Sequence, residues 1–212
     1  MPPAGGADAA GASSPSQTPA RAQAAVAASL PLDDPEDGAD ANRGLVARDE
    51  HLRIVAADGR VIWDPAATAF VDGPAPTSVN PSLWRQAKLA RLHGLFEVAD
   101  GIYQVRGYDL SNMSLVRGQT GWIVIDPLTT RETAAAAIAW ARQQLGPLPI
   151  VAVVFTHSHI DHFGGLEAVL PTEPAARAAI RIIAPRGFLE EATSENVLVG
   201  TPMIRRAMFQ FG

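Results

Sequence analysis

Three histidines and one aspartate lie within six residues, at His157, His159, Asp161 and His162. Imidazole and carboxylate ligands suit Zn, Fe or Mn, and because the chain has no cysteine, any bound metal must be held by His, Asp or Glu. His157 and His159 would serve one ion, and Asp161 and His162 a second. The spacing therefore predicts a site for two adjacent ions, with a single-metal or regulatory site as the open alternative.

The elements around this motif suit such a site. It follows Ile150 to Phe155, a continuous apolar run typical of a strand buried on both faces. Gly164 and Gly165 come directly after it and let the backbone turn tightly where bulky residues would crowd the site. The remaining histidines, His51 in a polar segment and His93 near a predicted helix end, are interpreted as structural or surface residues.

The sequence before the motif predicts strands and helices, with turn and capping residues that mark their ends. Asp58-Gly59 separates two short apolar runs and predicts a β-hairpin. Asn80-Pro81 predicts the start of a helix that ends at Gly94. Three further strands predict an antiparallel meander; they are Ile102 to Arg106, Met113 to Val116 and Trp122 to Ile125.

A helix is predicted after the meander, with Thr129 and Glu132 as a capping box, an Ala-rich body to Leu145, and Gly146-Pro147 as its stop. Beyond the motif, the pattern predicts two short helices and one strand, namely Glu167 to Leu170, Phe188 to Ala192, and Ile180 to Ala184. An α/β alternation that follows an antiparallel start predicts an α/β (α+β) fold.

Composition excludes several classes of protein. The 212 residues have a formal net charge of −5 and no run of Lys or Arg, which argues against nucleic acid and anionic membrane surfaces as partners. No apolar stretch approaches the length of a membrane span. Residues 1–29 are low-complexity and are expected to be disordered. They show no clear signal peptide, so a cytoplasmic location is the default expectation, with periplasmic or secreted export open if the start codon lies elsewhere.

The motif resembles the His-x-His-x-Asp-His signature of the metallo-β-lactamase superfamily. From about Leu30 to the last residue the chain is similar to the alkyl sulfatase branch, which hydrolyses dodecyl sulfate. The segments that carry this resemblance are Asn80 to Ala87, Gly94 to Glu97, Ile102 to Asn112, Gly121 to Thr130, Glu195 to Val197 and Arg205 to Gly212.

The resemblance implies a partial αββα sandwich, with two sheet layers between helices and two zinc ions at the sheet edge. His157 and His159 would bind the first Zn²⁺, and Asp161 and His162 the second. Asp126 would lie beside these ligands and contact them without binding the metal, or would only cap a turn before Pro127. Thr156 would hydrogen-bond within the loop, or would only be a strand-end residue.

The family completes each zinc with later ligands, but no histidine follows His162, and none of Glu167, Glu190, Glu191 or Glu195 is marked by spacing as a substitute. We therefore expect an N-terminal fragment of a longer enzyme, with weak zinc binding. Its expected parts are a tail (1–29), an extension with hairpin and helix (30–93) and a truncated metallo-β-lactamase-like domain (94–212). A homodimer is expected only of the full-length enzyme.

The implied reaction is metal-assisted hydrolysis of an alkyl sulfate, with cleavage of either the S–O or the C–O bond. Two alternatives stay open. One is another hydrolase of the same fold, such as a lactonase or thioesterase. The other is an inactive, truncated product.

Overall fold

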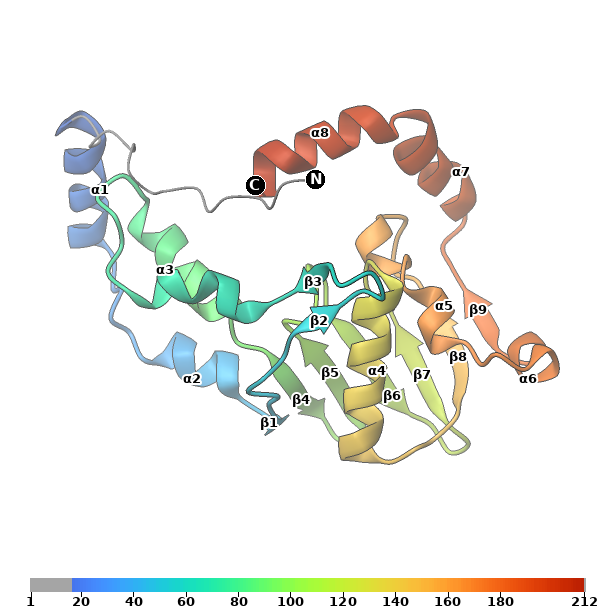
Figure 1. Ribbon diagram of the computed structural model, residues 1–212. Helices are drawn as coiled ribbons and strands as arrows, with labels where there is room; N and C mark the ends of the chain where they lie inside the picture. The colour runs from blue at the N-terminus through green and yellow to red at the C-terminus, as the bar shows by residue number, and fades with distance from the viewer. Residues whose placement is uncertain (1–16, 212) are drawn as a thin grey trace.

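A computed structural model describes residues 17–211, and its centre is a seven-stranded sheet of order β1-β4-β5-β6-β7-β8-β9 (Figure 1). Pairing is antiparallel from β1 to β7 and parallel from β7 to β9. The strands of this sheet are β1 (Leu45–Ala47), β4 (Gly94–Ala99), β5 (Ile102–Arg106), β6 (Met113–Arg117), β7 (Trp122–Ile125), β8 (Ile150–Val154) and β9 (Arg181–Ile183).

Helices flank this sheet and extend to both sides of it (Figure 1). They are α1 (Gln17–Ser29), α2 (Glu36–Asn42), α3 (Pro81–Ala90), α4 (Arg131–Leu145), α5 (Leu166–Val169), α6 (Pro174–Ala178), α7 (Phe188–Thr193) and α8 (Gly200–Phe211). Two 3₁₀ segments, Pro65–Asp72 and Ile160–His162, and one π-helical turn, Ser194–Leu198, complete the helical elements.

The predicted hairpin and meander are confirmed. β2 (Ile54–Val55) and β3 (Val61–Trp63) pair antiparallel as a separate two-stranded sheet. The turn between them contains Gly59 at φ +87°, a left-handed conformation that glycine adopts without steric cost. Strands β5, β6 and β7 pair in sequence order, as the alternation of strands and polar turns predicted.

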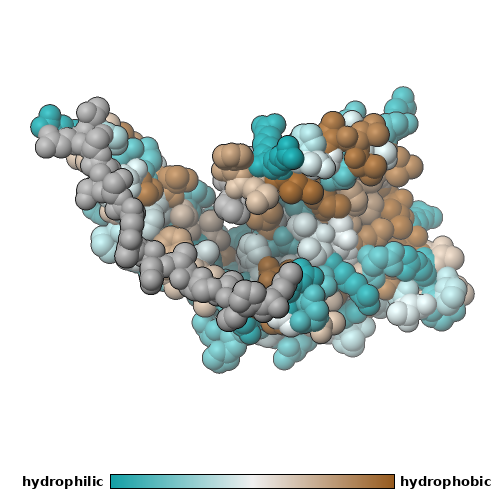
Figure 2. Space-filling view, turned by 45° about the horizontal axis from the view of Figure 1, so that its top comes forward, coloured by the Kyte–Doolittle hydropathy of each residue, from teal (hydrophilic) through white to brown (hydrophobic). Residues whose placement is uncertain are grey.

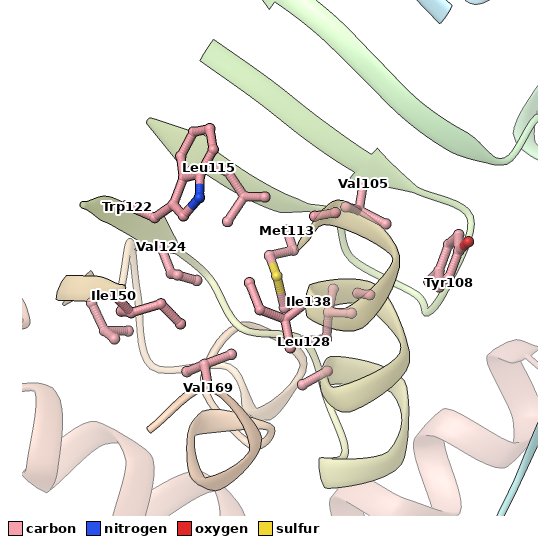
Figure 3. Packing of buried hydrophobic residues seen from close by; sticks show 14 of the residues in the cluster. Val105, Tyr108, Met113, Leu115, Trp122, Val124, Leu128, Ile138, Ile150 and Val169 are labelled. Carbon is pink, nitrogen blue, oxygen red and sulfur yellow. The ribbon is translucent and has the colours of Figure 1, made fainter. Parts of the chain in front are cut away.

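Helix α4 covers one face of the sheet and carries the crossover from β7 to β8 (Figure 1). Its buried residues Ala134, Ala137, Ile138 and Ala141 recur at the spacing of one helix face. They pack against the sheet in the main core, where Figure 3 shows Ile138 close to Met113. The small alanines allow the helix to lie close to the strands that carry the site.

Two helix boundaries differ from the prediction. The N-cap of α4 is Thr130, which forms a capping box with Thr133 in place of the predicted pair Thr129 and Glu132. Thr129 is unavailable because its backbone N–H and hydroxyl both donate to Asp109, at 3.0 and 2.7 Å. Helix α3 starts as predicted, since the Asn80 side chain accepts from two backbone N–H groups, but it ends at Ala90.

Residues 1–29 were expected to be disordered, and this expectation is wrong for residues 17–29. Residues 1–16 lie outside the described residues, but Gln17–Ser29 forms helix α1, which contacts α3. Six of these thirteen residues are alanine, which has the highest helix propensity of all residues. Contact with α3 adds burial that the low-complexity pattern does not show.

The fold class is confirmed as mixed α/β, and the described residues contain one of the two large sheet layers that an αββα sandwich would have. Within residues 17–211, no helix has the length and apolarity that a membrane crossing requires. Exposed apolar side chains gather on the C-terminal helices, and hydrophobic patches over this region are visible in Figure 2. They include Leu189, Leu198, Ile204, Met208 and Phe209.

Candidate metal centre

The parallel pairing of β7 with β8 brings the site together. Both strands end at the same edge of the sheet, where Asp126 follows β7 and Thr156 and His157 follow β8. The Asp126 N–H donates to the Val154 carbonyl at 3.0 Å, which extends the strand ladder by one bond. Residues 30 positions apart in the chain are therefore fixed side by side.

Asp126 is the centre of the hydrogen-bond network. Its side chain is 9% exposed, and its backbone has φ +55°, a conformation that aspartate tolerates better than most residues. One carboxylate oxygen accepts the Thr156 backbone N–H at 2.8 Å. The other accepts the Thr156 hydroxyl at 2.6 Å and His162 Nδ1 at 2.8 Å. The Asp126 carboxylate thus fixes the motif loop through hydrogen bonds to Thr156 and His162.

This network also assigns the protons of two imidazoles. An ionised carboxylate only accepts, so His162 Nδ1 carries a proton and the neutral ring keeps its lone pair on Nε2. The Thr156 hydroxyl gives its single proton to Asp126, so His157 Nδ1, 2.9 Å away, must donate to the hydroxyl oxygen. The lone pair of the neutral His157 ring is therefore also on Nε2, as a metal ligand requires.

The four motif side chains form two pairs of donor atoms. His157 Nε2 lies 3.0 Å from His159 Nδ1, and His162 Nε2 lies 3.3 Å from Asp161 Oδ2. Adjacent ligands of a tetrahedral zinc ion, at about 2.0 Å from the metal, lie roughly 3.3 Å apart. The rings of His157 and His162 are 4.0 Å apart between centroids, so the two pairs are adjacent.

The donor types and spacings thus fit zinc, with two ligands for each ion. Among residues 17–211, no three His, Asp or Glu side chains are grouped so that they could hold a single ion. A catalytic zinc normally has three protein ligands. The part of the chain that the structure describes therefore supplies two of these for each of the two ions that the sequence predicts.

Three contacts at the site were not predicted from the sequence. The Glu195 carboxylate lies 3.6 Å from His159 Nε2, on the far side of the ring from His157. The Ser111 hydroxyl donates to the Asp161 carbonyl oxygen. Asp109, two residues before Ser111 in the loop after β5, is buried and accepts hydrogen bonds from Thr129 and Thr133. The sequence shows Asp109 and Ser111 only as part of a polar turn between two predicted strands, and Glu195 only as one of several later glutamates that no spacing marks as a ligand.

Gly164 and Gly165 pack closely against the loop that follows β7. The Gly165 N–H donates to the Leu128 carbonyl at 2.9 Å. A Cβ at Gly165 would overlap the Pro127 carbonyl oxygen and would lie 2.5 Å from the Ala134 Cβ. The two glycines therefore allow the motif loop to approach the Asp126 loop, a more specific role than the tight turn predicted.

We expect Gly165→Ala to lower the free energy of unfolding by about 3 kcal/mol, because the methyl group forces two packed loops apart. Urea unfolding measures the change. The matched control is Gly38→Ala in α2, where nothing lies within 4 Å of the added Cβ and where alanine favours the helix. Equal stability of the two variants would contradict this packing role.

The two histidines outside the motif lie away from it. His93 Nε2 contacts the Asp49 carbonyl at 2.9 Å, which agrees with the predicted structural role, although His93 lies beyond the end of α3. His51 is exposed. The structure thus brings together all six residues that the sequence singled out at the site: the four motif residues, Asp126 and Thr156.

Comparisons with known proteins agree with this picture. Residues 106–209 match the metallo-beta-lactamase superfamily. The chain is 46% identical over 185 residues to a linear primary-alkylsulfatase from Pseudomonas sp. and 40% identical over 193 residues to an alkyl/aryl-sulfatase from Saccharomyces cerevisiae. These matches cover 86% and 91% of this chain, but it spans only 27% and 30% of the relatives' length.

A solved structure is also similar. It is that of a stereoselective inverting sec-alkylsulfatase from Pseudomonas sp., with a TM-score of 0.85 and 45% sequence identity. The match covers 93% of this chain and 32% of the other. Residues 106–209 therefore belong to the metallo-β-lactamase superfamily, and along most of its length the chain resembles alkylsulfatases.

Proposed function

We propose that this chain carries part of the active site of a zinc-dependent alkylsulfatase, a hydrolase of alkyl sulfate esters such as dodecyl sulfate. The observation that carries the proposal is the set of hydrogen bonds around Asp126, from which we infer that Nε2 of His157 and of His162 carries the lone pair that a metal needs. The similarity to alkylsulfatases supports the choice of sulfate esters as substrate.

The residues have distinct roles in this proposal. His157 and His159 hold one ion, and Asp161 and His162 hold the second. Asp126 and Thr156 orient the rings and bind no metal. When bound, zinc supplies positive charge for the sulfate oxygens and lowers the pKa of a water molecule, so that hydroxide forms near neutral pH.

A hybrid enzyme, in which this chain replaces the matching segment of a known alkylsulfatase, tests the proposed sulfatase function. In the Pseudomonas linear primary-alkylsulfatase, the matched 185 residues are exchanged for those of this chain, and sulfate release from dodecyl sulfate is measured. We expect a folded, active hybrid, and we expect the 212-residue chain alone to release none above background, since it supplies two ligands for each ion. A folded hybrid that cleaves a lactone or thioester and no alkyl sulfate would contradict the proposal.

Metal binding can be measured on the chain alone. We expect weak zinc binding, which is lost for the most part in the double variant His157→Ala/His159→Ala, because the described part of the chain gives each ion two ligands. Titration calorimetry gives the stoichiometry and affinity. The control is His51→Ala, which removes an exposed imidazole outside the motif. Unchanged zinc stoichiometry in the double variant would show that the motif is not the site.

A further inference from the structure

His159 is the motif histidine that the Asp126 network does not orient. Asp126 binds His162 directly, and it orients His157 through the Thr156 hydroxyl. The His159 side chain is 59% exposed, against 23% for that of His162. A histidine that binds a metal needs a partner on its second ring nitrogen, which fixes the ring and the position of its proton. For His159 this partner must come from elsewhere in the fold.

Glu195 lies where such a partner is needed. Its carboxylate is 3.6 Å from His159 Nε2, and the other ring nitrogen, Nδ1, is 3.0 Å from His157 Nε2. An ionised carboxylate only accepts, so Glu195 favours the ring form of His159 with the proton on Nε2 and the lone pair on Nδ1. The lone pairs of His157 and His159 then face each other, and only a cation between them makes this arrangement favourable.

The exposure of Glu195 is the reverse of that of its neighbours. It lies in the π-helical turn Ser194–Leu198, a type of turn that often occurs at functional sites. The Glu195 side chain is 25% exposed, whereas Val197 and Leu198 are largely exposed. A carboxylate normally faces water, and an aliphatic side chain normally faces the core. The turn therefore directs the carboxylate to the motif although apolar residues of the same turn stay in solvent.

Phe188 fixes the segment that carries Glu195 beside the motif loop. Its ring stacks on Phe155, the last residue before Thr156, with 5.2 Å between the centroids. It also lies 5.1 Å from the ring of Phe163, the residue that follows the motif. Helix α7 begins at Phe188, and Glu195 comes directly after this helix and the turn residue Ser194 (Figure 1). The approach of Glu195 to the motif thus follows from aromatic packing at both ends of the loop.

We propose that Glu195 is a positioning residue for the first metal ion. It accepts the Nε2–H of His159 and thereby holds Nδ1 towards the ion that His157 also binds; the inference rests on the proposed zinc site. Glu195 is not itself a ligand, because the His159 ring lies between its carboxylate and His157 Nε2. The contact of 3.6 Å is longer than a hydrogen bond, and a small rotation of the exposed His159 ring closes it.

Zinc titration calorimetry on the 212-residue chain tests the proposal. We expect Glu195→Ala to weaken zinc binding about tenfold, as removal of the partner of a metal ligand does. Glu195→Gln keeps an acceptor oxygen but loses the charge, so its effect should be smaller, about threefold. The matched controls are Glu191→Ala and Glu191→Gln, which replace an exposed glutamate of α7 and should bind zinc as the unchanged chain does. Circular dichroism confirms that each variant is folded.

Long-range ¹H–¹⁵N NMR spectra of the zinc-saturated chain separate positioning from a general effect of charge. Recorded at slightly alkaline pH, where imidazole is neutral, they show which ring nitrogen carries the proton. His159→Ala identifies the His159 signals. We expect the proton on Nε2 of His159 in the unchanged chain and a mixture of the two ring forms in Glu195→Ala. His157 and His162 should keep their ring forms in this variant, because Asp126 still orients them.

The outcomes separate this inference from the proposed function. Weaker zinc binding in Glu195→Ala, a smaller loss in Glu195→Gln, and a changed ring form at His159 alone support it. Full zinc affinity in Glu195→Ala overturns it, and so does a ring form of His159 that the substitution leaves unchanged. Equal changes at all three rings would overturn it as well. Failure of the proposed zinc site would appear separately, as unchanged zinc stoichiometry in His157→Ala/His159→Ala.

Discussion

Asp161→Ala should reduce sulfate release at least a hundredfold in the hybrid between this chain and the Pseudomonas relative. In the proposed site, Asp161 is one of the two ligands that residues 17–211 give the second ion, and its Oδ2 is 3.3 Å from His162 Nε2. Removal of one group that stabilises charge in a transition state costs on the order of a hundredfold or more in rate.

The control for this experiment is Asp100→Ala, an exposed aspartate in the turn between β4 and β5. It should leave the rate unchanged. A chelator should reduce the activity of the unsubstituted hybrid, and added zinc should restore it. An Asp161→Ala hybrid that keeps its full rate would place the reacting ion elsewhere.

Asp126→Ala should lower both the stability and the zinc affinity of the chain alone. It leaves the Thr156 N–H, the Thr156 hydroxyl and His162 Nδ1 without their acceptor, and it puts alanine at φ +55°. We expect the free energy of unfolding to fall by about 3 kcal/mol. Zinc affinity should fall about 10- to 100-fold, because the His157 and His162 rings are no longer oriented.

Asp126→Asn separates the two effects. Asparagine tolerates a positive φ and keeps one acceptor oxygen, so much of the stability should be retained. Its single amide oxygen cannot replace both carboxylate oxygens, so the amide N–H₂ must face either the Thr156 N–H or the pair formed by the Thr156 hydroxyl and His162 Nδ1. Because the loop is then displaced, zinc affinity should still fall. Urea unfolding and calorimetry measure the two quantities, with Asp100→Asn as the control. Undiminished zinc affinity in Asp126→Asn would contradict the orienting role.

The elements near the site were predictable because their signals are local. β7 and β8 are apolar runs of strand length, and Asn80-Pro81 forms the predicted cap. β4 was missed although its first three residues are fully buried, because it follows directly on the loop after α3. α8 was also missed, and its exposed apolar residues Ile204 and Met208 lie on either side of the adjacent pair Arg205 and Arg206.

The site itself was predictable in its ligands but not in its supports. His157, His159, Asp161 and His162 are close in sequence, so their proximity needs no knowledge of the fold. The contacts of Ser111 with Asp161 and of Glu195 with His159 join residues more than 30 positions apart. Spacing along the chain carries no signal for such pairs. The same reason explains the misplaced cap of α4, since Thr129 is held by Asp109 from a distant loop.

Strand order also determines when the histidine loop acquires its shape during folding. Strands β4 to β7 pair with their sequence neighbours and close only short loops, whereas β8 reaches β7 only through the α4 crossover. Closing the longer loop costs more chain entropy, and contacts distant in sequence form more slowly. We therefore expect the contacts of Asp126 with Thr156 and His162 to form after the meander, and the histidine loop to be among the last parts of this sheet edge to become ordered.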